Sequence, residues 1–182
     1  MKFEQYLNET KWMDKTMLGY KVDSNDLNQI TKTIKSFLDK TKIPYIQTMN
    51  HHITIAQIIG KYSKDDIIRE IHKIPSNFNM KPKKLKLLWG KNVKKWFITI
   101  EYNQVDKYKK ALEMIENVYP DVVKFPGGMK PHISLFSIDG DDLDPYVWND
   151  IDQRKFFLPT IKLKEVQLFN NKFELEFEYK KI

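Results

Sequence analysis

His52-Ile53-Thr54-Ile55 recurs later in the chain as His132-Ile133-Ser134-Leu135. In each copy, which we name a tetrad, a histidine is followed two residues later by a hydroxyl side chain, with apolar residues between and after. Because successive side chains of a strand point to opposite faces, the histidine and the hydroxyl share one face. Each tetrad therefore predicts a strand with a buried back and a front that pairs a proton-transfer group with a hydrogen-bonding hydroxyl.

The tetrads account for two of the four histidines in the chain, and both lie on apolar stretches. The alternative is that His52 and His132 are core histidines of half-buried strands. The other two histidines fit a structural role better. His51 has the opposite strand parity to His52, and His72 lies in a helical stretch with no partner at strand spacing.

The composition predicts a folded protein that acts outside the membrane. The 182 residues are 41% hydrophobic, with no apolar run long enough to span a bilayer. The first residues, Met1 to Gln5, lack the apolar core of a secretory signal, so we expect a cytoplasmic protein. With no cysteine in the chain, disulfides and thiolate sites are excluded.

The net charge of +7 favours an anionic partner. Nearly all of the positive charge is lysine, since Arg69 and Arg154 are the only arginines. Lysine attracts phosphate as a point charge, whereas sequence reading in a groove relies on guanidinium forks. We therefore expect a nucleotide or short RNA-like partner and no duplex DNA, with a solvated lysine surface as the alternative.

Apolar periodicity predicts the order strand, helix, tetrad strand twice over. This repetition predicts two similar α+β lobes in one domain, each with one tetrad. The expected strands are 16–22, 51–59, 85–89, 96–102, the second tetrad strand, 161–169 and 173–179, and the expected helices are 27–38, 64–73 and 105–118.

Two histidines facing one cleft are the equipment for cleaving a phosphodiester at a ribose. One imidazole takes the proton of the 2′-hydroxyl and the other protonates the leaving oxygen. Thr54 and Ser134 would hold the non-bridging phosphate oxygens. The sequence leaves open which histidine is the base. It predicts no metal or other cofactor, because neither His51-His52 nor the acidic run from Asp139 to Asp144 has a convincing ligand set.

The paired tetrads resemble those of the two-histidine (2H) phosphoesterase superfamily. The flanking segments Met17-Leu18-Gly19-Tyr20, His51 to Ala56 and Lys130-Pro131 look most like the bacteriophage anti-CBASS nucleases. The resemblance implies the bilobal 2H (LigT-like) α+β fold, with two antiparallel sheets, helices outside and a central cleft. It also implies hydrolysis of cyclic di- and trinucleotide second messengers through a 2′,3′-cyclic phosphate by a monomer or weak oligomer, in the host cytoplasm if the protein is viral.

The resemblance gives further residues a role in substrate binding. Tyr20 would contact a nucleotide or be a core residue, and Trp89 or Trp96 would stack on a base or join the core. Glu165 interrupts an apolar strand phase and would recognise a base edge. Lys130 would attract phosphate beside His132.

The same residues are compatible with two other functions. The chain could act on RNA 2′,3′-cyclic ends or 2′-5′ oligonucleotides, or it could be a catalytically silent nucleotide- or RNA-binding module. The presence of both histidines and both hydroxyls argues against the silent module, because binding alone needs no pair of proton-transfer groups.

Overall fold

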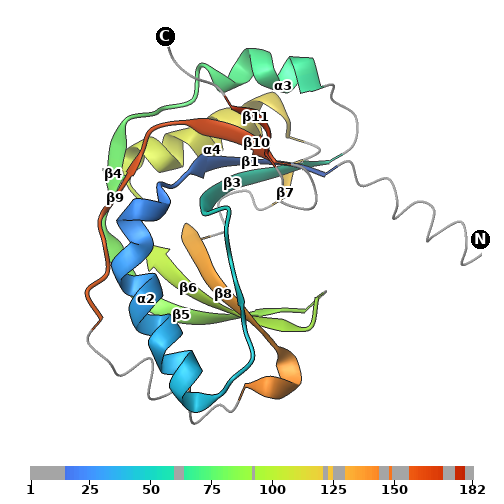
Figure 1. Cartoon of the computed structure of the whole chain (residues 1–182). Coiled ribbons are helices and arrows are strands. Elements are labelled where there is room, and N and C mark those ends of the chain that lie inside the picture. The colour runs from blue at the N-terminus through green and yellow to red at the C-terminus, as the bar shows by residue number, and fades with distance from the viewer. Residues whose placement is uncertain are drawn as a thin grey trace, which may run out of the picture.

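The computed structural model describes residues 15–59, 64–91, 93–120, 123–124, 130–143, 148, 156–169 and 175–178. Most of their strands form two antiparallel sheets (Figure 1). The first sheet comprises, in spatial order, β11 (Leu175–Glu178), β10 (Val166–Phe169), β1 (Lys15–Lys21), β3 (His52–Ile59) and β7 (Val123–Lys124). The second comprises β2 (Ile46–Gln47), β8 (His132–Asp139), β6 (Lys95–Tyr102) and β5 (Pro82–Gly90), while β4 (Phe78–Met80) and β9 (Ile161–Leu163) form a separate pair. The expected α+β fold of two antiparallel sheets is confirmed.

The predicted repeat of strand, helix and tetrad strand is present in both sheets. β1 and β3 flank α2 (Ser24–Thr41) and pair antiparallel, and β6 and β8 flank α4 (Asp106–Val118) and do the same. Each sheet therefore carries one tetrad strand next to the strand that precedes it in the repeat.

Each helix of the repeat lies against the sheet of the other half. The hydroxyl of Tyr108 on α4 donates to the backbone oxygen of Thr54 on β3 at 2.7 Å. Conversely, α2 lies beside the second sheet (Figure 1), where burial and then the charge of Asp26 raise the pKa of Tyr102 on β6. This exchange of helices connects the two sheets through the core.

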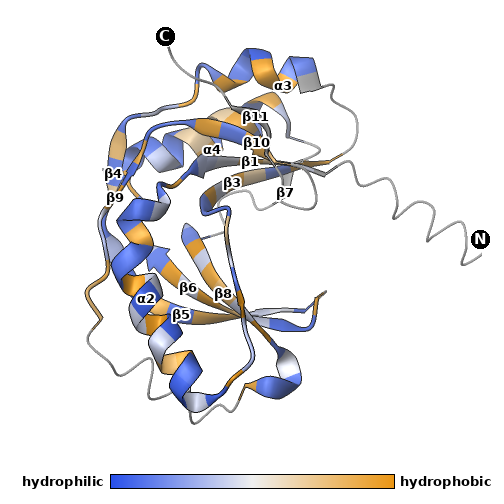
Figure 2. Cartoon of the chain, viewed as in Figure 1, coloured by the Kyte–Doolittle hydropathy of each residue, from blue (hydrophilic) through white to orange (hydrophobic). Residues whose placement is uncertain are grey.

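The sequence of α2 explains its limits and its buried side. Asp23 caps the N-terminus by accepting from the backbone N–H of Asn25 at 2.9 Å, and the chain leaves the helix through the left-handed conformation of Lys42. Hydrophobic and hydrophilic residues alternate along α2 (Figure 2), because its apolar residues recur at helical spacing. The buried set contains all the predicted positions: Leu27, Ile30, Ile34, Phe37 and Leu38.

A β-bulge lies at the last residue of each tetrad. On β3 the pairing with β1 passes from Thr54 to Ala56, so Ile55 is the extra residue. On β8 the pairing with β6 passes from Ser134 to Phe136, so Leu135 is the extra residue. Bulges bend a strand and re-aim its side chains, and they are frequent beside active sites. The two bulges thus set the direction of the two histidine–hydroxyl pairs in the same way.

Gly19 allows β1 to approach the first bulge closely. A Cβ atom at this position would lie 2.9 Å from the backbone oxygen of Ile53, which is too close for any other residue.

The third described α-helix, α3 (Lys64–Ile71), buries Ile67 and Ile71. No helix in the described part of the chain combines the length and apolar character that a membrane span requires.

Candidate active site

The polar residues of both tetrads line one small pocket. His52 and Thr54 come from β3, and His132 and Ser134 come from β8, which contacts β3 across the two sheets. The segment before β3 adds Thr48 and Asn50 to the lining. The pocket holds about 30 Å³, which is room for about one or two water molecules, so a group as large as a nucleobase would lie outside it.

The segment 46–50 holds the two tetrads together. β2 pairs with β8 through Ile46 and Gln47, and the next backbone N–H, that of Thr48, donates to the oxygen of Leu135 at 2.9 Å. The chain then passes through Asn50 directly into β3. A single short segment is therefore bonded to one tetrad strand and covalently continuous with the other.

Both catalytic candidates have the same tautomer, set by the same contact. Nδ1 of His52 lies 2.9 Å from the backbone oxygen of Asn50, and Nδ1 of His132 lies 3.0 Å from that of Lys130. A carbonyl oxygen only accepts, so each Nδ1 carries the hydrogen and donates it. Nε2 is then the nitrogen of each ring that takes up and releases a proton near neutral pH.

The environment favours the neutral form of both rings. Burial lowers the pKa of His52, and the charge of His132 lowers it further, against the opposing effect of the Asn50 carbonyl. Burial likewise lowers the pKa of His132, with Lys86 acting in the same direction and the Lys130 carbonyl and Glu101 opposing. Because the charge of one imidazole acts on the other, protonation of the first disfavours protonation of the second.

A buried carboxylate beside His132 is a feature that the sequence reading missed. Glu101 on β6 pairs directly with His132 on β8 and is only 3% exposed. Its oxygens lie 3.3 Å from Nζ of Lys83 and 3.9 Å from Nζ of Lys86. The polar alternation of Thr99 and Glu101 with Ile98 and Ile100 was the available signal, but its meaning depends on the pairing of β6 with β8.

Tyr20 does not reach the pocket. Its side chain is fully buried, its hydroxyl donates to the backbone oxygen of Pro75 at 2.6 Å, and its ring packs edge-on against Phe78. The predicted contact with a nucleotide is therefore wrong, and the alternative of a core tyrosine holds, because its hydroxyl is satisfied inside the protein.

The two predicted stacking tryptophans lie on the wrong face of the second sheet. Thr99 and Glu101 on β6 pair with Ser134 and His132, so they share the face of the pocket. Trp96 is an odd number of residues from both along the strand, so its side chain points to the opposite face. Trp89 pairs with Trp96 and shares its face, with ring centroids 4.7 Å apart. Trp89 is 45% exposed, but neither ring lines the histidine pocket.

The side chains of the remaining predicted positions do not line the pocket. Glu165 lies in the turn between β9 and β10, so the strand parity assigned to it is wrong, and it lines a separate small hollow with His72. Lys130 is exposed, and its backbone oxygen holds His132. His51 is buried with Nδ1 3.4 Å from the Ser24 hydroxyl, and it does not line the pocket.

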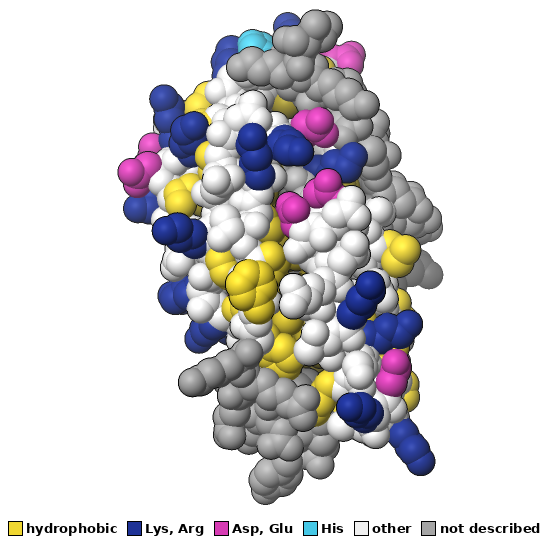
Figure 3. All heavy atoms as spheres, turned by 60° about the vertical axis from the view of Figure 1, so that its left-hand side comes forward, with side chains coloured by type: hydrophobic (Ala, Val, Ile, Leu, Met, Phe, Trp, Pro, Cys, Tyr) yellow, Lys and Arg dark blue, Asp and Glu magenta, His cyan; other side chains and the backbone are white. Residues whose placement is uncertain are grey.

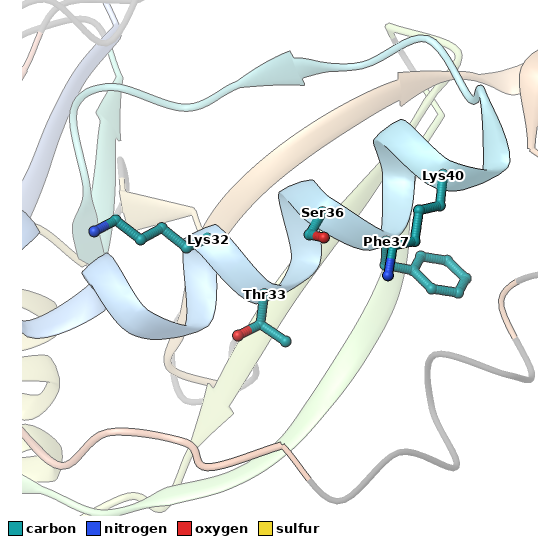
Figure 4. A pocket seen from close by; sticks show the side chains of 5 residues that line it. All are labelled: Lys32, Thr33, Ser36, Phe37 and Lys40. Atoms are coloured by element: carbon teal, nitrogen blue, oxygen red, sulfur yellow. The ribbon is translucent and has the colours of Figure 1, made fainter.

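A larger hollow of about 390 Å³ runs along α2 (Figure 4). Its lining comes from one helix and holds no histidine or carboxylate: Lys32, Thr33, Ser36, Phe37 and Lys40.

The described part of the surface shown in Figure 3 has no concentrated basic patch, because its lysine and arginine side chains are spread out and interspersed with acidic ones. Among the described residues, no three His, Cys, Asp or Glu side chains are grouped as metal ligands. The histidine pocket is therefore the best candidate site.

Solved structures of low sequence identity share this fold. Usb1 from Kluyveromyces marxianus superposes with a TM-score of 0.61 at 8% identity, over 89% of this chain and 96% of that chain. The structure of the same protein with uridine monophosphate gives 0.58 at 8% identity, over 85% and 94%. TT0787 of Thermus thermophilus gives 0.55 at 9% identity, over 91% and 96%. The chain therefore shares the overall α+β fold of these proteins. No protein-family model and no curated protein matches the sequence.

Proposed function

We propose that this protein is a phosphodiesterase of the two-histidine type that cleaves an RNA-like phosphodiester by proton transfer through His52 and His132. One observation carries the proposal: two imidazoles with the same tautomer line one pocket together with the two hydroxyls of their tetrads. The fold shared with Usb1 and TT0787 supports it.

The proposed reaction needs both protonation states of histidine at once. Nε2 of one ring takes the proton of the ribose 2′-hydroxyl, and the 2′-oxygen attacks the phosphorus. The bond to the 5′-oxygen breaks, and Nε2 of the other ring protonates that oxygen. The products are a 2′,3′-cyclic phosphate and a free 5′-hydroxyl, and water then opens the cyclic phosphate with the roles of the rings exchanged. Thr54 and Ser134 hydrogen-bond the non-bridging oxygens.

For the substrate, we propose cyclic di- and trinucleotide second messengers, as the resemblance to the phage anti-CBASS nucleases implies. In that case the protein would counter a bacterial immune signal. A second candidate is an RNA 2′,3′-cyclic or 2′-5′ oligonucleotide phosphodiesterase, which the shared fold with Usb1 in its uridine monophosphate structure favours. A third, the non-catalytic binding module, is decided by the same experiment.

The test is a panel of substrates incubated with the protein in the presence of a chelator. The panel contains cyclic dinucleotides, a cyclic trinucleotide, 2′-5′ oligoadenylate and an RNA with a 2′,3′-cyclic end. We expect cleavage of at least one substrate and a loss of roughly 100-fold or more in His52→Ala and in His132→Ala. His72→Ala, which alters an exposed histidine outside the pocket, is the matched control.

Cleavage of the linear RNA substrates alone would select the second candidate. Binding without cleavage of any substrate would select the third. Activity that requires added metal, or that persists in both histidine variants, would overturn the mechanism.

A further inference from the structure

We propose that Lys83 and Lys86 on β5, held by the buried carboxylate of Glu101, form a second anion site that binds the phosphate next to the scissile one. This inference rests on the proposed phosphodiesterase function and narrows its substrate class. The substrate is then an oligonucleotide, linear or cyclic, that carries at least one further phosphate next to the one being cleaved.

Lys86 and Glu101 share a face of the second sheet with the histidine pocket. Lys86 pairs with Thr99, and Thr99 pairs with Ser134, so the three residues form one row across β5, β6 and β8. Glu101 and His132 form the adjacent row. Neighbouring strands lie about 4.8 Å apart, which places Lys86 about 10 Å along the face from Ser134.

The cluster of Lys83, Lys86 and Glu101 has an uncompensated positive charge. Glu101 is 3% exposed and forms ion pairs with two ammonium groups, at 3.3 Å for Nζ of Lys83 and 3.9 Å for Nζ of Lys86. One carboxylate balances one of the two lysines, so the three groups together carry one positive charge. A carboxylate is costly to bury unless it is paired, and here the two lysines that pair with it lie together at one point of the sheet.

Lys86 can exchange Glu101 for another anionic partner. Its contact with Glu101 is at the outer limit of an ion pair, and its side chain is 39% exposed. A phosphate arriving on this face offers a stronger charge-assisted hydrogen bond than the existing contact. The field of Lys86 already extends to the pocket, because it lowers the pKa of His132.

The experiment compares a substrate that the wild-type protein cleaves with an analogue in which the phosphate next to the scissile one is an uncharged methylphosphonate. We expect the wild type to cleave the analogue with a kcat/KM lower by about tenfold, mainly through KM, as for the loss of one charge-assisted contact. In Lys86→Gln the kcat/KM values for the substrate and for the analogue should differ by no more than about twofold. In Lys86→Arg they should still differ by about tenfold. The same tenfold difference is expected in Lys109→Gln on α4, which is the matched control.

Equal kcat/KM for both substrates in the wild type, or an unchanged ratio in Lys86→Gln, would overturn the second anion site and leave the phosphodiesterase function intact. Cleavage of mononucleoside 2′,3′-cyclic phosphates alone would do the same. Failure of the wild type to cleave any substrate would instead refute the proposed function, and the anion site with it.

Discussion

The imidazole of His52 stacks against the ring of Phe169, with centroids 4.8 Å apart and an angle of 33° between the planes. Phe169 is buried on β10, two strands away from β3 across β1. With Nδ1 bound to the Asn50 carbonyl and one ring face covered by Phe169, the orientation of His52 is fixed from two directions.

We therefore expect Phe169→Leu to reduce kcat/KM by about tenfold while costing less unfolding free energy than the roughly 3 to 5 kcal/mol of a truncation to alanine, since leucine fills part of the space of the ring. Steady-state kinetics and urea unfolding measure the two quantities. Phe78→Leu is the matched control, because Phe78 is equally buried but packs on Tyr20 outside the pocket. A loss of activity no greater than that of the control would show that the stacking does not position His52.

Tyr108 gives a second test of positioning, this time at Thr54. Removal of its hydroxyl in Tyr108→Phe leaves the backbone oxygen of Thr54 without this donor and should cost about 1 to 3 kcal/mol. Tyr20→Phe removes a similar hydrogen bond, to the oxygen of Pro75, away from the pocket. We expect comparable losses of stability from the two variants but reduced kcat only in Tyr108→Phe. Equal activities would contradict a role for α4 in holding the first tetrad.

The activity should depend on pH with a bell-shaped profile whose maximum lies on the acid side of about 6.5, the ordinary pKa of histidine. Catalysis requires one neutral and one protonated imidazole, and the pKa values of both His52 and His132 are lowered, chiefly by burial. The fraction of protein with one proton on the pair is therefore greatest below that value. The kcat/KM profile of the free enzyme measures this, and a maximum above pH 7 would be inconsistent with the buried pocket.

The stability of the fold should fall in acid for a related reason. Burial lowers the pKa of His51, as it does for the two catalytic candidates, so the unfolded chain binds more protons than the folded one below about pH 6.5. Above that pH these histidines do not reduce the free energy of unfolding. It decreases as the pH falls toward the folded pKa values, by at most about 1.4 kcal/mol per pH unit for each histidine.

His51 is the position at which to test this decrease without altering the pocket. Its Nε2 atom is buried with no hydrogen-bond partner among the described residues, so a proton there is poorly accommodated. Chemical denaturation between pH 5 and 7 should show a shallower slope for His51→Asn than for the wild type, with His72→Asn as the substitution control. An unchanged slope would assign the acid sensitivity to other groups.

The sequence was sufficient to predict the parts of the site that depend on local pattern. Alternation along each tetrad identified the strands and the side chains that face together, and the helical spacing from Leu27 to Leu38 identified the buried side of α2. The bulges at Ile55 and Leu135 were not predicted, although each is followed by a second apolar residue, Ala56 or Phe136, which breaks the alternation.

What the sequence could not supply was the pairing of distant strands. Glu101 acquires its place beside His132 only through the register of β6 on β8, and Thr48 reaches the pocket only because β2 pairs with β8. The same limitation explains the errors. Strand parity alone assigned Glu165 to a continuous strand that in fact breaks at residues 164–165, and it left open which face Trp96 occupies.

The claim that both imidazoles act on one phosphate has a direct test by nitrogen NMR of the histidine rings. A non-cleavable 2′-deoxy analogue of the preferred substrate is titrated into the protein while the Nε2 signals are followed. We expect the signals of His52 and His132 to shift together and saturate at one equivalent, both with protonated Nδ1 in the neutral form, while the signal of His72 stays in place. A shift of only one of the two, or saturation at different ligand concentrations, would show that the histidines serve separate sites.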